Sequence, residues 1–283
     1  MPARGEGVYN AVVIGAGTAG LVTAAGTAGL GGRVALVERH RMGGDCLNTG
    51  CVPSKALIAS ARAAALIRDA GRLGLQPQEP RFRFEDVMER VRERRARLAP
   101  HDSQERFESL GVDVFRGAAR FLSPHEVEVG AQRLRARHFV IATGSRAALP
   151  PIEGLPGARP FTNETIFDEL RARPARLAVI GGGPIGCELG QAFGRLGVQV
   201  TLLEALPRLL DKEDEDAAAL VRAQLESEGV RVVTGARVRR AARQGALTRL
   251  ELETGEAIEA EAVLVAAGRR PNVEGLGLDA AGV

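Results

Sequence analysis

The chain has 283 residues, 45% of them hydrophobic, and its formal net charge is only +3. This length and composition suit two globular domains, and the small net charge gives no reason to expect nucleic-acid binding. Three cysteines are too few for a secreted disulfide framework. No apolar run approaches the roughly 18 residues of a membrane span, and the N-terminal residues lack a signal-peptide core. We therefore expect a cytoplasmic protein that does not enter a membrane.

The N-terminal part predicts a dinucleotide-binding βαβ unit. Residues 10–39 read NAVVIGAGTAGLVTAAGTAGLGGRVALVER, an apolar run followed by G-x-G-x-x-G, a helical stretch, a second apolar run and an acidic residue. The glycines are Gly15, Gly17 and Gly20, and the acid is Glu38. In such units the first glycine makes the turn, the second lets a pyrophosphate approach the backbone, and the third lets helix and strand pack closely. The acid accepts a hydrogen bond from a ribose hydroxyl.

Two of the three cysteines lie close together in the next segment, GGDCLNTGCVPSKALI, residues 43–58. In a regular helix Cys46 and Cys51 would be about 7.5 Å apart along the axis, beyond the usual disulfide range. The intervening residues must therefore leave the helix if the pair forms a disulfide, and Gly50 supplies the freedom for such a turn. Pro53 suits a first helical turn, which places Cys51 at a helix N-terminus. The helix dipole there, with Lys55 one turn later, favours a thiolate.

Redox chemistry and zinc binding both use close cysteine pairs in a reducing compartment. No second C-x2-C pair and no histidine cluster in the sequence could complete four zinc ligands. We therefore favour a redox-active pair and expect no metal site.

After the cysteines, the pattern predicts helices over residues 52–70 and 84–110, the second broken near Pro100, and short strands over residues 112–141. The charged run in the second helix interleaves glutamates with arginines at helical spacing, which predicts a solvated face. A strand then ends in the small-residue turn of HFVIATGSRAALP, where Gly144 can bring the backbone close to a cofactor. The loop of residues 150–157, rich in proline and glycine, marks a crossing between domains.

The pattern of residues 10–39 occurs a second time. Residues 177–206 read LAVIGGGPIGCELGQAFGRLGVQVTLLEAL, with Gly181, Gly183, Gly186 and Glu204 in the corresponding places. In both copies 23 positions separate the first glycine from the acid. A helix is predicted over residues 213–229, and AVLVAAGRRPNVEG repeats the small-residue turn, now with Gly268. We expect the remaining cysteine, which follows Gly186, to be a buried small side chain without redox function.

The cysteine motif, the two dinucleotide motifs, ATGS and AGRRPN together resemble the class I pyridine nucleotide-disulfide oxidoreductases, such as mercuric reductase, dihydrolipoamide dehydrogenase and glutathione reductase. The resemblance covers essentially the whole chain. It implies an α/β fold of two Rossmann-like βαβ domains, the second inserted in the first. Residues 1–150 would bind FAD, residues 151–272 would bind NAD(P), and residues 273–283 would begin a truncated further FAD-contacting segment.

The resemblance also implies roles for individual residues. Cys51 would be the thiol beside the flavin and Cys46 the thiol that attacks substrate, while Lys55 and Glu188 would form an ion pair near the flavin. Electrons would pass from NAD(P)H to FAD, then to the Cys46–Cys51 disulfide, and then to a small disulfide or a metal ion; a dithiol substrate would reverse the flow. The expected cofactor-binding residues are Gly15, Gly17, Gly20, Glu38, Gly43, Gly44, Lys55, Ala119, Thr143, Gly144, Gly181, Gly183, Gly186, Glu204, Val238 and Gly268.

Some alternatives stay open at this point. Glu204 favours NAD because a carboxylate repels a 2′-phosphate, but Arg208 keeps NADP possible. Family members usually continue into a dimerisation domain that supplies a catalytic histidine, and the sequence ends at Val283 without one. We expect a homodimer only for full-length members. Instead of a disulfide oxidoreductase, the chain could be a noncatalytic redox sensor that binds FAD and NAD, or a flavin-dependent NADH oxidase that acts on oxygen.

Overall fold

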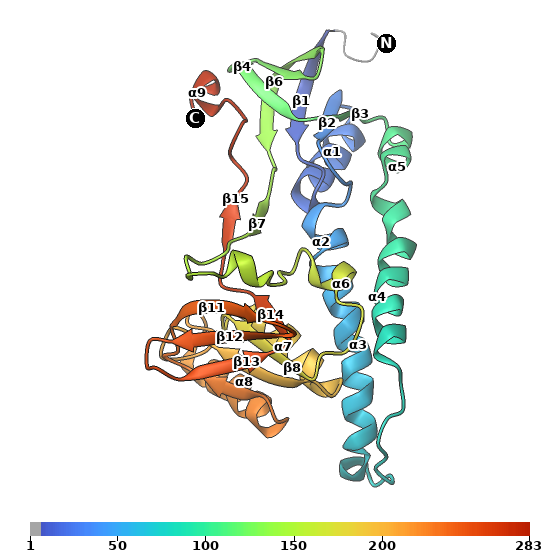
Figure 1. Cartoon of the computed structure of the whole chain (residues 1–283). Coiled ribbons are helices and arrows are strands. Elements are labelled where there is room, and N and C mark those ends of the chain that lie inside the picture. The colour runs from blue at the N-terminus through green and yellow to red at the C-terminus, as the bar shows by residue number, and fades with distance from the viewer. Residues whose placement is uncertain (1–6) are drawn as a thin grey trace. The chain divides into compact units, whose positions relative to one another are not determined.

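The structure is a computed structural model that describes residues 7–283. The chain forms two compact units, and most of their elements are labelled in Figure 1. Unit 1 consists of the described residues up to Val52, residues Arg95–Arg146 and residues Arg270–Val283. Unit 2 consists of residues Pro53–Arg94 and Ala147–Arg269. Along the chain, unit 2 is therefore inserted into unit 1.

The sheet of unit 1 has the strand order β3-β2-β1-β6-β5-β4. Strands β3, β2, β1 and β6 are parallel, and β6, β5 and β4 continue the sheet as an antiparallel meander. The elements are β1 (Val8–Ile14), α1 (Thr18–Gly29), β2 (Val34–Glu38), α2 (Gly44–Asn48), α5 (Gln104–Ser109), β3 (Asp113–Arg116), β4 (Ala119–Ser123), β5 (Glu126–Val129), β6 (Gln132–Ile141) and α9 (Leu278–Ala281).

Unit 2 contains a parallel sheet of order β10-β9-β8-β14 and an antiparallel sheet of order β11-β12-β13. Its elements from the 3₁₀ helix η3 onward are η3 (Pro156–Ala158), α6 (Ile166–Glu169), β8 (Arg176–Ile180), α7 (Pro184–Arg195), β9 (Gln199–Leu203), α8 (Glu215–Ser227), β10 (Arg231–Val233), β11 (Val238–Gln244), β12 (Leu247–Leu252), β13 (Ala257–Ala260) and β14 (Ala262–Val265).

The two parallel sheets share one topology, which confirms the internal repeat. In each unit the parallel strands lie in the order third, second, first, fourth along the chain, the order of a dinucleotide-binding half. The long strand β6 of unit 1 pairs both with the meander and with the parallel strands. In unit 2, β13 belongs to the antiparallel sheet and β14 to the parallel sheet. The predicted α/β class with two Rossmann-like units is therefore confirmed.

Strand β2 explains why the parallel strands read as continuous apolar runs. Val34 and Leu36 pack in one hydrophobic cluster with Leu21 of α1, and Ala35 and Val37 pack in another on the opposite face. All five residues of the strand are buried. Successive side chains of a strand point to opposite faces, so both faces of this sheet must be covered.

The helical segment of residues 53–94 groups with unit 2, whereas the sequence placed it within residues 1–150 as part of the first domain. Helices α3 (Cys51–Arg68) and α4 (Phe84–Leu98) supply most of its length, with the 3₁₀ helix η1 (Ala70–Leu73) between them. Leu57, Phe84 and Met88 are buried in the same cluster as Leu189 and Phe193 of α7. The apolar faces of these helices thus complete the core of unit 2.

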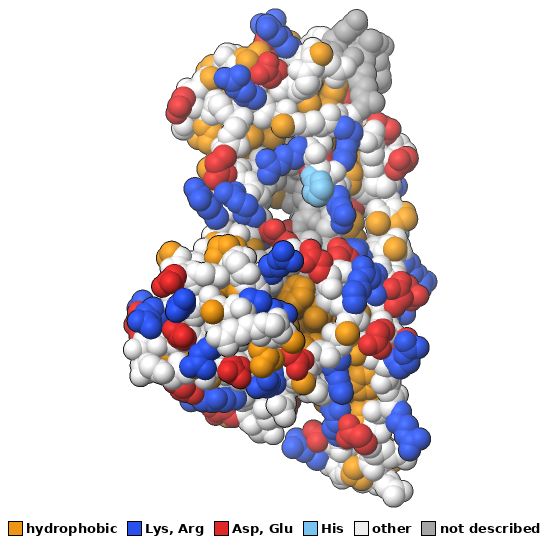
Figure 2. Space-filling view, in the orientation of Figure 1, with side chains coloured by type: hydrophobic (Ala, Val, Ile, Leu, Met, Phe, Trp, Pro, Cys, Tyr) orange, Lys and Arg blue, Asp and Glu red, His pale blue; other side chains and the backbone are white. Residues whose placement is uncertain are grey.

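The predicted break near Pro100 is confirmed, because α4 is followed by the 3₁₀ helix η2 (Ala99–Asp102) before α5 begins. Strands β7 (Ser145–Ala147) and β15 (Arg269–Pro271) pair with each other where the chain passes from one unit to the other. On the face shown in Figure 2, basic and acidic side chains are interspersed, as the small net charge leads one to expect.

Residues Gly44–Arg68, which comprise α2, the turn at Gly50 and α3, are long and apolar enough to cross a membrane by length and composition, with a mean hydropathy of 1.2 over an 18-residue window. The sequence patterns did not single out this stretch. Core helices of globular domains have the same composition, and α3 buries Leu57 and Ala61 in the core of unit 2. We therefore interpret α3 as a helix that packs one face on the core of unit 2.

Candidate functional site

The first glycine of each motif has a backbone conformation and a contact that exclude a side chain. Gly15 and Gly181 have φ values of 107° and 112°. A Cβ atom there would lie 2.3 Å from the carbonyl oxygen of Ala142 and 2.5 Å from that of Ala266, respectively. The two glycine turns therefore pack directly on the backbone at the end of the fourth parallel strand, next to the turns of Gly144 and Gly268.

The third glycine of each motif is required for packing within its own turn. A Cβ at Gly20 would lie 1.7 Å from the carbonyl oxygen of Gly15, and one at Gly186 would lie 1.9 Å from that of Gly181. No side chain can be accommodated at either distance, so these glycines allow the helix to start close to the strand.

The second glycine is different, because the protein itself leaves space there. A Cβ at Gly183 would meet no atom within 4 Å, and one at Gly17 would make only an ordinary contact, 3.6 Å from the Cα of Gly44. Both glycines are N-caps of helices, α1 and α7, and no side chain caps either helix. The space and the uncapped N–H groups suit an anionic group such as a pyrophosphate.

The acidic residue of the first motif, Glu38, is hydrogen-bonded to the glycine turn of the same motif. One carboxylate oxygen of Glu38 accepts a hydrogen bond from the Ala16 amide at 2.8 Å, and the other accepts one from the His40 amide at 2.6 Å. Glu38 is buried. Each carboxylate oxygen has a further lone pair, so the group can still accept a ribose hydroxyl.

Glu204 repeats these bonds in unit 2, accepting from the amides of Gly182 at 2.6 Å and Leu206 at 2.8 Å. A pocket of about 980 Å³ opens over this part of unit 2. Among the residues predicted for the second cofactor, those that line it are Gly181, Gly183, Glu204, Val238 and Gly268. The third glycine, Gly186, does not line the pocket; it is buried in α7 and packs against the Gly181 backbone.

Arg208 does not line this pocket. Its guanidinium donates to the carbonyl oxygens of Leu210, Asp211 and Glu213 at 2.5–3.0 Å, which holds the loop that forms one wall. The position of Arg208 therefore does not support the expectation that it could bind the 2′-phosphate of NADP, because its guanidinium is hydrogen-bonded to the loop.

The predicted break between the two cysteines is confirmed. Cys46 lies in α2, which ends at Asn48, and Cys51 is the first residue of α3. Gly50 lies in the turn between the helices, where a Cβ would come within 3.0 Å of the Asp45 carbonyl oxygen. Both cysteines are in the reduced thiol form; Cys46 is partly buried and Cys51 is exposed.

The Cys46 thiol is influenced by its neighbour and by α1. Burial raises its pKa above the ordinary value, and a hydrogen bond and charge interaction with Cys51 raise the pKa further, while a hydrogen bond with Thr18 acts in the opposite direction. Thr18 is the first residue of α1, and a Cβ at Gly44 of α2 would lie 2.4 Å from the Cα of Gly17. The thiol pair therefore lies against the glycine turn of unit 1.

Sequence reasoning missed two residues that hold the cysteine turn. The Asn48 side chain donates to the carbonyl oxygens of Met42 and Gly44 at 3.0 and 2.8 Å. The Arg95 guanidinium donates to the Asn48 carbonyl oxygen at 2.9 Å, at the end of the helix that carries Cys46. No spacing in the sequence connects Arg95 with this turn.

The predicted ion pair is present in unit 2. The Lys55 ammonium lies 2.8 and 2.7 Å from the two carboxylate oxygens of Glu188. Both side chains are exposed, so the pair is not a buried charge that the fold requires. Cys187 beside it is buried, as expected, and its thiol donates to the Gly182 carbonyl at 3.4 Å.

The remaining predicted residues of unit 1 are placed as follows. Gly43, with a φ of 85°, donates its amide to the Ala16 carbonyl at 2.9 Å, so it lies at the glycine turn. Thr143 and Gly144 follow the strand on which Gly15 packs. Ala119 is buried in β4, at the edge of the sheet, and its contact with the cofactor remains a prediction.

A family model described as "Pyridine nucleotide-disulphide oxidoreductase" matches residues 9–283. The chain is 35% identical to the mercuric reductase of Lysinibacillus sphaericus, over 98% of the chain and 51% of that protein. It is 38% identical to the dihydrolipoyl dehydrogenase of Thermus scotoductus, over 97% of the chain and 60% of that protein.

Among solved structures, the HOCl-induced flavoprotein disulfide reductase RclA from Escherichia coli matches with a TM-score of 0.84 and 29% identity, over 97% of this chain and 60% of that one. The chain thus spans about half to three fifths of the length of these relatives.

Proposed function

Because the chain belongs to the pyridine nucleotide-disulphide oxidoreductase family, we propose that it is a flavin-dependent oxidoreductase whose Cys46 and Cys51 thiols exchange electrons with the substrate. The observation that carries the proposal is the position of the thiol pair against the glycine turn of unit 1. A redox pair next to a nucleotide turn is the arrangement that flavin-coupled disulfide chemistry requires.

The residues fit the two cofactors of the family. Unit 1 would hold FAD on the turn of Gly15, Gly17 and Gly20, with Glu38 facing the ribose. Unit 2 would hold the nicotinamide nucleotide in the pocket lined by Gly183 and Glu204. When bound, FAD supplies two-electron exchange between the nicotinamide and the cysteine pair.

Within the chain, the chemistry is thiol–disulfide exchange. In the direction of substrate reduction, the thiolate of one cysteine attacks a sulfur of the substrate disulfide, forming a mixed disulfide and releasing the first substrate thiolate. The second cysteine then attacks the protein sulfur of that mixed disulfide, which releases the second substrate thiolate and forms the Cys46–Cys51 disulfide. The substrate gains two electrons and the cysteine pair loses two.

The assignment of Cys46 as the attacking thiol rests on the family resemblance, because exposure alone favours Cys51. Small disulfides, dithiols and metal ions are the proposed substrate classes, since the similar proteins are called mercuric reductase, dihydrolipoyl dehydrogenase and glutathione reductase. A cytoplasmic location, and a homodimer for the full-length protein, stay predictions.

For the nicotinamide we propose NAD. The Glu204 carboxylate lines the pocket, where it would repel a 2′-phosphate, and Arg208 is bonded to the loop carbonyls instead.

An anaerobic titration of the purified chain with FAD, using NADH and then NADPH, tests the proposal. We expect two electron pairs to be taken up per chain, one by the flavin and one by the cysteines, with growth of a long-wavelength absorbance band that Cys51→Ser abolishes. Uptake of only one pair would show that the cysteines are not coupled to the flavin. Single reduction without continued NADH oxidation when a disulfide is added would favour the redox sensor.

A further inference from the structure

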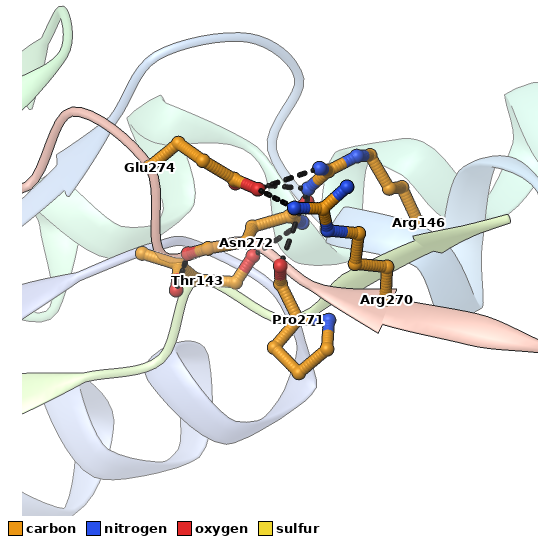
Figure 3. A network of polar contacts seen from close by, with 6 residues as sticks. All are labelled: Thr143, Arg146, Arg270, Pro271, Asn272 and Glu274. Carbon is orange, nitrogen blue, oxygen red and sulfur yellow. Dashed lines mark hydrogen bonds and ion pairs between the residues drawn. The ribbon is translucent and has the colours of Figure 1, made fainter. Parts of the chain in front are cut away.

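The end of the AGRRPN motif bonds to the small-residue turn of unit 1, as Figure 3 shows. The Asn272 backbone amide donates to the Gly144 carbonyl oxygen at 3.0 Å, and its side-chain nitrogen donates to the Thr143 carbonyl oxygen at 2.9 Å. The Thr143 hydroxyl in turn donates to the Asn272 carbonyl oxygen at 2.7 Å. Three hydrogen bonds therefore join one asparagine to two consecutive residues of the turn.

Arg146 determines which way the Asn272 amide faces. Its guanidinium donates to the Asn272 side-chain oxygen at 2.8 Å, and a guanidinium can only donate, so the amide nitrogen must face Thr143. Arg146 is held by Glu274 through hydrogen bonds of 2.8 and 3.1 Å. The hydrogen bond from Arg146 is the largest influence that lowers the pKa of Glu274 to about 2, so this carboxylate is charged at neutral pH.

These bonds engage the carbonyl oxygens of the turn and leave its amide donors available. The carbonyl oxygens of Thr143 and Gly144 both accept from Asn272. The amides of the same two residues have no hydrogen-bond partner among residues 7–283. Gly144 has a φ of 66°, and a Cβ there would meet no atom within 4 Å. The turn therefore offers donors and open space to a ligand with acceptor atoms, as a flavin nucleotide has.

We propose that Asn272, oriented by Arg146, is a positioning residue for the cofactor of unit 1, which keeps the Thr143 and Gly144 amides directed toward acceptor atoms of the flavin nucleotide. This rests on the proposed function, in which unit 1 binds FAD. The sequence placed AGRRPN with the second cofactor through Gly268, whereas the asparagine of that motif acts within unit 1. A positioning residue acts by limiting the geometry of its neighbours, so its loss should loosen the turn.

Asn272→Asp tests the proposal. Aspartate keeps an oxygen for Arg146 but replaces the donor to Thr143 with a carboxylate oxygen, which the Thr143 carbonyl repels. The matched control is Arg270→Gln, because Arg270 is exposed and contacts the same Glu274 at 3.4 Å. FAD affinity is measured by fluorescence titration, the environment of the bound flavin by its visible spectrum, and the turn by hydrogen exchange of the peptide that contains residues 143–147.

We expect Asn272→Asp to weaken FAD binding by about tenfold or more, to alter the spectrum of the flavin that still binds, and to speed exchange in residues 143–147. Arg270→Gln should stay within about twofold of the unaltered chain. FAD affinity and exchange unchanged by Asn272→Asp would overturn the inference and leave the proposed function intact. If the unaltered chain bound no FAD, the proposed function would fail. In that case, hydrogen exchange measured without cofactor would test the inference. Exchange in residues 143–147 that is unchanged by Asn272→Asp would overturn it.

Discussion

Replacing Gly183 with alanine should weaken nucleotide binding to unit 2 without lowering the stability of the fold. The new Cβ would meet no protein atom within 4 Å, and the extended backbone at Gly183 (φ −75°) is one that alanine adopts readily. Alanine is a poorer N-cap than glycine by about 0.5–1 kcal/mol. It also reduces the conformational entropy of the unfolded chain, which stabilises the folded state by a similar free energy. We therefore expect the free energy of unfolding to change by less than about 0.5 kcal/mol.

The same Cβ would stand in the pocket, where Gly183 forms part of the lining at the start of α7. A pyrophosphate could no longer approach the helix N-terminus closely, so NADH affinity should fall by about tenfold or more, which corresponds to about 1.4 kcal/mol or more. Urea denaturation measures the stability, and the quenching or enhancement of NADH fluorescence measures the binding.

Gly186→Ala is the matched control in the same turn. Its Cβ would lie 1.9 Å from the Gly181 carbonyl oxygen, so it should lower the free energy of unfolding by about 3 kcal/mol or more. Two outcomes for Gly183→Ala would refute the reasoning: NADH affinity equal to that of the unaltered chain, or a stability loss above about 2 kcal/mol.

Four further predictions concern single side chains. Arg208→Gln should weaken NADH and NADPH binding together, because the guanidinium holds a pocket wall, and a selective loss of NADPH binding in parallel titrations would contradict this. Alkylation of Cys46 in the reduced chain, followed by peptide mass spectrometry, should still be increasing at about pH 9, because burial raises its pKa and the thiolate reacts; a plateau below about pH 8 would be contrary. Burial raises the pKa of Cys187 to about 11, and the peptide that contains Cys187 should therefore stay unmodified at about pH 8. Lys55→Gln should cost less than about 1 kcal/mol of stability, because the pair with Glu188 is exposed, yet slow the reduction of the cysteines by NADH in stopped-flow measurements.

The glycine turns could be predicted from the sequence because their geometry is local. Gly15, Gly20 and Glu38 lie within one βαβ unit, and the spacing between them follows from the strand, turn and helix that connect them. The break between Cys46 and Cys51 could be predicted for the same reason, since helical rise alone excludes a short thiol separation in a regular helix. Two copies with equal spacing made the presence of two Rossmann-like units predictable as well.

Contacts between distant parts of the chain could not be predicted in this way. Arg95 reaches the end of α2 from 47 positions away, and Asn272 reaches Thr143 from 129 positions away, and no periodicity connects either pair. The apolar faces of α3 and α4 indicate that these helices are buried, but not which core receives them. That choice depends on the shape of the partner surface, here the side chains around Phe193 of α7.

The central claim is that Cys46 and Cys51 form one two-electron redox couple linked to the nicotinamide nucleotide. The most direct measurement is differential alkylation of the oxidised chain before and after anaerobic addition of NADH, with and without FAD, read by peptide mass spectrometry. We predict that both cysteines become alkylated together, only when FAD and NADH are both present, while Cys187 does not change. Cysteines that stay oxidised with both cofactors bound, or that become reduced without FAD, would contradict the account.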